Sequence, residues 1–89
     1  MVTLFARHMV VDYTAWRKAY DEVQPMQEAG GVIAEAVYQS VDDPNDVTVT
    51  HDFDTLDAAR AFMGSDDLKA AMTASGVVGE PTVWFANKV

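Results

Sequence analysis

Three segments of this chain have a pattern that places apolar side chains on both faces of a β-strand. They are residues 2–10, 31–41 and 81–89. In the first, Leu4 and Val10 fall on one face, and Phe5 and Met9 fall on the other. Helices can cover one face of such a sheet, but a chain of 89 residues has little left to cover the second. A second copy of the chain is therefore expected there, so the sequence predicts a homodimer.

Composition favours a single domain over residues 1–89, located in the cytoplasm. A chain of this size buries only about 60% of its unfolded surface, so a partner subunit would add stability. A net charge of −8 with only six Lys and Arg residues argues against nucleic acid and anionic membranes as partners. The chain has no cysteine, which excludes disulfides, thiolate nucleophiles and zinc–thiolate sites. No apolar run approaches the roughly 18 residues of a membrane span.

A helix is expected after the first strand. Asp12 is a good N-cap for it, and Trp16 and Tyr20 recur at helical spacing on its apolar side. Pro25 should kink or end this helix, because proline removes a backbone donor and crowds the preceding turn.

The second half of the chain predicts a strand, two short helices and a final strand. Residues 47–53 alternate between apolar and polar in the clearest strand pattern of the chain. Asp54 and Ser65 are expected to cap the two helices that follow. The order βαββαβ predicts a ferredoxin-like α+β fold, with a four-stranded antiparallel sheet in spatial order 4-1-3-2 and helices on one face.

Residues 42–46, with the sequence Asp-Asp-Pro-Asn-Asp, predict the turn of a hairpin. The acidic side chains suggest calcium as an alternative. The spacing of an EF-hand loop, with its central glycine and terminal glutamate, is missing, so a plain turn is the preferred interpretation.

Several motifs together resemble one known group. They are residues 7–13 (Arg-His-Met-Val-Val-Asp-Tyr) with Trp16, the turn at 43–46, and residues 65–69 followed by 74–77. In these the chain is similar to the antibiotic-biosynthesis-monooxygenase-like group of dimeric α+β barrels, over nearly its whole length. The resemblance implies a back-to-back dimer of sheets and a small-molecule cleft between each sheet and its helices. Activities in the group include cofactor-free oxygenation of aromatic polyketides, haem breakdown and lactone isomerisation.

The resemblance also implies what is absent. The haem-degrading branch carries a tryptophan at the end of the third strand and a ligating histidine in the last helix. Those places hold Phe53 and Met72 in this chain. Haem chemistry is therefore not expected, and no cofactor is expected.

Strand parity identifies two histidines as candidate catalytic residues. If the helices cover the face of Val47 and Phe53, then His51 faces them too, and burying Leu4 rather than Arg7 also places His8 there. The first and third strands are neighbours in this topology, so the two residues are expected opposite or diagonal to each other, with their β-carbons within about 5 to 8 Å. Such a pair in an apolar cleft could act as general base and electrophile toward a phenol or enol.

Expected ligand contacts around these histidines are aromatic and apolar. A two-histidine metal site with Asp12 or Asp52 is an alternative in residue type, but Asp52 faces away by parity and Asp12 lies beyond the strand, so no metal is expected. The expected function is a cofactor-independent monooxygenase or cyclase-like enzyme for a small aromatic molecule. The alternative is a non-catalytic dimeric module that binds a small molecule or is purely structural. The expected ligand-binding residues are Tyr13, Trp16, Phe53, Phe62 and Met72.

Overall fold

The computed structural model describes residues 1–89 as four strands and four helices. The strands form one antiparallel sheet in the order β2-β3-β1-β4. This confirms the predicted ferredoxin-like fold and its strand order, with each helical segment divided into two helices. In chain order the elements are β1 (Val2–Val10), α1 (Tyr13–Glu22), α2 (Gln24–Ala29), β2 (Ala34–Gln39), β3 (Asp46–Phe53), α3 (Leu56–Met63), α4 (Asp66–Ala74) and β4 (Val77–Asn87).

Helix α1 begins and ends where the sequence predicts. The Asp12 carboxylate accepts a hydrogen bond from the Ala15 N–H at 3.0 Å, which satisfies one of the free donors of the first turn. The helix ends at Glu22, and Pro25 lies in the first turn of α2. The missing N–H of a proline costs no hydrogen bond at that position. The break between the two helices falls at Val23, two residues before Pro25.

The cap of α3 differs from the prediction. Thr55, and not Asp54, precedes the first helical residue, and its hydroxyl accepts from the Ala58 N–H at 3.1 Å. A capping oxygen must reach an N–H of the first turn, so a start at Leu56 selects the residue directly before it. Ser65 caps α4 as predicted, by accepting from the Leu68 N–H.

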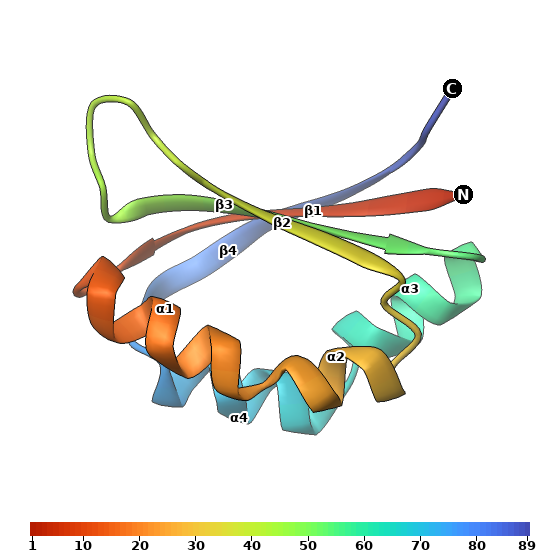
Figure 1. Cartoon of the computed structure of the whole chain (residues 1–89), viewed down its shortest axis with the longest axis horizontal. Coiled ribbons are helices and arrows are strands. Elements are labelled where there is room, and N and C mark those ends of the chain that lie inside the picture. The colour runs from red at the N-terminus through yellow and green to blue at the C-terminus, as the bar shows by residue number, and fades with distance from the viewer.

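All four helices lie on one side of the sheet, and the other side carries none (Figure 1). We call these the covered face and the open face. In the pairing of β1 with β3, the even-numbered residues of β1 lie opposite the odd-numbered residues of β3, and both sets face the helices, as predicted. On the open face, Phe5 and Trp84 stack with ring centroids 5.2 Å apart. The buried residues that β1 and β3 place on the covered face are Val2, Leu4, Ala6, His8, Val10, Val47, Val49, His51 and Phe53.

The core under the covered face has two parts. One cluster gathers around Phe53 and Phe62 with α3 and α4, and the other gathers around Trp16 and Val47 with α1. Both Phe53 and Val47 have no exposed surface. This division matters because a cavity lies where the two clusters meet.

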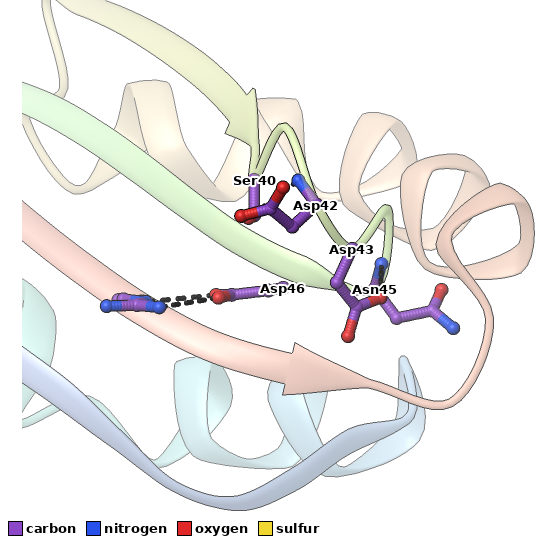
Figure 2. A network of polar contacts seen from close by, with 6 residues as sticks. Ser40, Asp42, Asp43, Asn45 and Asp46 are labelled. Atoms are coloured by element: carbon purple, nitrogen blue, oxygen red, sulfur yellow. Dashed lines mark hydrogen bonds and ion pairs between the residues drawn. The ribbon is translucent and has the colours of Figure 1, made fainter.

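The acidic turn between β2 and β3 uses its side chains for its own geometry (Figure 2). Asp43 Oδ1 accepts from the Asn45 N–H at 2.9 Å, and Ser40 Oγ accepts from the Asp42 N–H at 3.2 Å. Asp46 forms a two-bond ion pair with Arg7 of β1. Side chains that satisfy backbone donors in this way are typical of turns, as predicted. No group of three His, Cys, Asp or Glu side chains in the chain is arranged to hold a metal ion.

Candidate active site between the sheet and the helices

A small apolar cavity lies between the two core clusters, with a volume of about 60 Å³. Strands β1 and β3 form its roof, and α1, α3 and α4 supply most of its remaining walls. Twelve of its sixteen lining residues are hydrophobic. The four others are His8, Gln27, His51 and Ser75.

His51 on β3 is one of the buried members of this polar group. Only 5% of its surface is exposed, and Phe62 of α3 meets the imidazole edge to face at 5.5 Å between centroids. Its Nε2 lies 3.0 Å from the hydroxyl of Tyr20 on α1. That hydroxyl lies 2.7 Å from Oε2 of Glu35, which is the cross-strand neighbour of His51 on β2.

The direction of these hydrogen bonds follows from the chemistry of Glu35. An ionised carboxylate only accepts, so Tyr20 donates its hydrogen to Glu35. The Tyr20 oxygen is then free to accept from His51, and the neutral imidazole carries its hydrogen on Nε2. Its Nδ1 consequently holds a lone pair, and this atom is buried without a hydrogen-bond partner.

Burial sets the protonation of this group. It lowers the pKa of His51 to about 4, against smaller opposing effects of the Glu35 and Asp52 carboxylates. Burial also raises the pKa of Tyr20, and the hydrogen bond to Glu35 raises it further. Both side chains are therefore neutral at pH 7.

His8 lies at the other end of the cavity in a different setting. It packs against Trp16 with ring centroids 5.6 Å apart, and its Nδ1 is also buried without a partner. The pairing of β1 with β4 shifts register between Arg7 and Met9, so His8 has no partner residue on β4. Burial lowers the pKa of His8 as well.

The predicted contact between the two histidines is wrong. His51 pairs with Leu4, and His8 pairs with Val47, so the rings are four residues apart along the strand pair. That offset corresponds to roughly 13 Å. Strand parity fixes the face of a side chain but does not fix its position along the neighbouring strand. The two histidines can therefore neither act on one atom nor share one metal ion.

The expected ligand-binding residues fall into two groups. Trp16, Phe62 and Met72 line the cavity. Tyr13 and Phe53 do not: Tyr13 packs against Trp16 with centroids 5.9 Å apart, and Phe53 is buried behind Phe62 at 5.5 Å. These two residues support the walls.

Three site residues were not identified from the sequence. The sequence pattern places Tyr20 only in the apolar stripe of α1, and it does not single out Glu35 or Gln27. Glu35 shares its strand face with Val37, so an acid on the inward side of β2 was a usable signal. Gln27 is only 3% exposed on α2, and nothing in its sequence context indicates this burial.

Gly30 lies outside the cavity lining and leaves room for the ring of Phe62. A Cβ atom at this position would lie 2.6 Å from Cδ1 of Phe62. Real Cβ contacts are never this short, so any larger residue would require the Phe62 ring to move. The C-terminal end of α2 can approach Phe62 only because residue 30 has no side chain.

The fold and the site together define a ferredoxin-like α+β domain with a histidine-lined apolar cavity under its sheet. Residues 13–74 match the family model described as antibiotic biosynthesis monooxygenase. That match covers more than half of the sequence, and the chain belongs to this family. No curated protein gives a sequence match. No helix is both long and apolar enough to span a membrane.

Solved structures of low sequence identity share the fold over nearly the whole chain. One is a predicted antibiotic biosynthesis monooxygenase from Bordetella bronchiseptica, with a TM-score of 0.85 at 19% identity, covering 99% of this chain and 96% of that one. Another, from Nitrosomonas europaea, has a TM-score of 0.77 at 15% identity, covering 100% and 99%. SnoaB, a cofactor-independent oxygenase from Streptomyces nogalater, has a TM-score of 0.76 at 15% identity, covering 99% and 94%.

Proposed function

We propose that this protein is a cofactor-independent oxygenase that acts on a small phenolic or enolic aromatic molecule in the cavity. His51 would serve as the general base. Trp16, Phe62 and Met72 would contact the ring of the substrate, and His8 would orient its far end. The expected homodimer and the expected cytoplasmic location belong to the same proposal.

The observation that carries this proposal is the buried, unpartnered Nδ1 of His51, a residue that lines the apolar cavity. A buried acceptor without a partner costs about 1–3 kcal/mol, so such atoms are rare and call for an explanation. A phenol or enol hydroxyl would supply the missing donor. Removal of its proton gives an electron-rich anion, and such an anion can pass an electron to dioxygen without a metal or flavin. The SnoaB likeness and the family are consistent with this chemistry.

The size of the cavity limits the substrate. Its volume of about 60 Å³ is well below the roughly 150 Å³ of an engineered apolar cavity that admits benzene. A one-ring ligand would therefore need the walls to move. Met63 and Met72 line the cavity, and unbranched methionine side chains adjust their shape at low cost.

A second subunit is proposed on the open face. Trp84 is 43% exposed there and stacks on Phe5, and Met9 and Tyr38 are exposed as well. Aromatic and methionine side chains of this kind are enriched in interfaces. The dimeric barrel implied by the resemblance uses the same face.

Oxygen consumption tests the proposed reaction. The purified protein would be mixed with one-, two- and three-ring phenols, with oxygen uptake recorded by electrode and products identified by mass spectrometry. We expect turnover of at least one phenol, and a loss of about a hundredfold or more in His51→Phe, as is typical when a general base is removed. A control variant, Val41→Ala, changes a fully exposed residue outside the cavity lining and should retain turnover. Turnover that is unchanged in His51→Phe would contradict the assigned base.

The small volume also favours one alternative, a module that binds without catalysis or has a structural role. Native mass spectrometry of the freshly purified protein separates these outcomes. A co-purified aromatic ligand that is released unchanged in the presence of oxygen would support binding alone. Absence of any ligand, together with no turnover across the phenol series, would support a structural role.

A further inference from the structure

The hydrogen-bonded residues Glu35, Tyr20 and His51 form a chain that leads from the cavity to the edge of the sheet. Each residue belongs to a different element: His51 to β3, Tyr20 to α1 and Glu35 to the edge strand β2. The two links measure 3.0 Å and 2.7 Å. His51 and Tyr20 are buried, and Glu35 is partly exposed. The chain therefore connects a buried acceptor to a group that solvent can reach.

We propose that Glu35, Tyr20 and His51 act as a proton relay that takes a proton from the cavity and delivers it to Glu35. This inference rests on the proposed function, in which a phenol or enol gives up its proton at Nδ1 of His51. The new element is the role of Tyr20 and Glu35. They are positioning residues, since they act through His51 and do not contact the cavity proton themselves.

The relay moves three protons and leaves no charge on the two buried residues, His51 and Tyr20. The phenol O–H bond breaks and its proton bonds to Nδ1 of His51. The Nε2 proton moves to the Tyr20 oxygen, and the Tyr20 proton moves to Oε2 of Glu35. At the end His51 and Tyr20 are neutral, Glu35 is a neutral acid, and the negative charge has passed from Glu35 to the ligand oxygen.

The surroundings favour this route over a charged intermediate. Helices α3 and α4 present only apolar side chains to the cavity, and Ser75 directly after α4 is uncharged. These residues therefore offer no negative charge that would stabilise an imidazolium at His51. The charged groups near the chain are Glu35, Asp52 and Arg17, whose guanidinium carbon lies 5.4 Å from the centre of the Tyr20 ring. Burial opposes both an imidazolium at His51 and a tyrosinate at Tyr20. A relay in which both stay neutral avoids both costs.

Nitrogen-15 NMR of the imidazole at pH 7 tests the relay, since it distinguishes the two neutral tautomers from the imidazolium. Without ligand, we expect His51 as the single tautomer protonated on Nε2. Saturation with 4-nitrophenol, an acidic one-ring phenol, should convert it to the tautomer protonated on Nδ1, with no imidazolium. The absorbance of the bound probe should at the same time show the phenolate.

Three variants separate the relay from simpler explanations. Tyr20→Phe keeps the ring but removes the bridge, so the single ligand-free tautomer should be lost. Glu35→Gln keeps an acceptor for Tyr20 but cannot take up a proton, so the probe should no longer switch the tautomer. In this variant the ionised fraction of the bound probe should fall by about tenfold, equivalent to one pKa unit. Asp52→Asn is the matched control, because it removes a nearby carboxylate that lies outside the chain, and the switch should persist.

Each outcome decides between the relay and its competitors. A wild-type His51 protonated on Nδ1 without ligand, or a tautomer unchanged in Tyr20→Phe, would overturn the relay alone. An imidazolium with bound probe would show a simple general base, and would overturn the relay while supporting the proposed function. If neither 4-nitrophenol nor any other phenol binds, the proposed function fails and the relay fails with it.

Discussion

The two faces of the sheet treat polar side chains in opposite ways. On the open face two polar pairs form: Arg7 with Asp46, and Thr3 with Asp52 at 2.6 Å. On the covered face the Nδ1 atoms of His8 and His51 are buried without partners, and no other side-chain nitrogen or oxygen in the chain is in that state. Buried side-chain atoms without a partner therefore occur only at these two residues, both of which line the cavity. The covered face therefore differs from the open face in carrying buried nitrogen atoms without partners, and the candidate site is built on that difference.

The largest expected effect is on the covered face, at Phe53. This side chain has no exposed surface, and Phe53→Ala would leave a void beside Phe62 and Leu4. We expect the free energy of unfolding to fall by about 3–5 kcal/mol. Urea unfolding followed by circular dichroism would measure it. Val41→Ala, a change at a fully exposed residue, is the control and should stay within about 0.5 kcal/mol of the parent.

The second prediction concerns the pH dependence of the free energy of unfolding, to which the buried His51 of the covered face contributes. The pKa of His51 falls from 6.5 to about 4 on folding, so between these values the unfolded chain binds more protons. Stability from neutral His51 is therefore fully present above pH 6.5 and is lost as the pH falls toward 4. The loss should reach roughly 3 kcal/mol.

Urea unfolding across this pH range would measure the loss. In His51→Phe most of the slope should disappear, even though the variant is less stable at pH 7. A smaller slope should remain, because burial also lowers the pKa of His8. Equal slopes in the parent and in His51→Phe would contradict the buried, neutral assignment.

The third prediction concerns the open face. Trp84→Asp places a charge where the second subunit is proposed, and we expect the dimer to dissociate with a loss of about 2 kcal/mol or more in association. Sedimentation velocity at micromolar concentration would detect this. Val41→Asp adds the same charge at the exposed turn and should leave the dimer intact. A monomeric parent protein would remove the basis for an open-face interface.

The smallest expected effect is at the ion pair of the open face. Arg7 is 60% exposed at its side chain, so its bond to Asp46 is weakened by solvent and salt. Arg7→Met should change the melting temperature only slightly, in contrast with Phe53→Ala. A large loss on this substitution would show that the pair is covered in the assembled protein, and repeating both melts in high salt would separate charge from packing.

The fold could be predicted from the sequence because its signals are local. Period-two alternation in residues 47–53, the caps at Asp12 and Ser65 and the break near Pro25 each depend on a few neighbours in the chain. The site could be predicted only in part. Parity placed His8 and His51 on the covered face, but no direct turn joins β1 to β3, so their offset was not encoded locally. Similarly, the link from Tyr20 to Glu35 joins α1 to an edge strand across 15 positions.

Gly30 carries a consequence for how the cavity can change. Phe62 forms part of the wall, and its position depends on the absence of a side chain at a residue outside the cavity. A single methyl group added at position 30 would lie 2.6 Å from Cδ1 of Phe62, so the ring would have to move and the wall of the cavity would change. A substitution at the C-terminal end of α2 could therefore change the volume of the cavity. The residues that line the cavity would keep their identities.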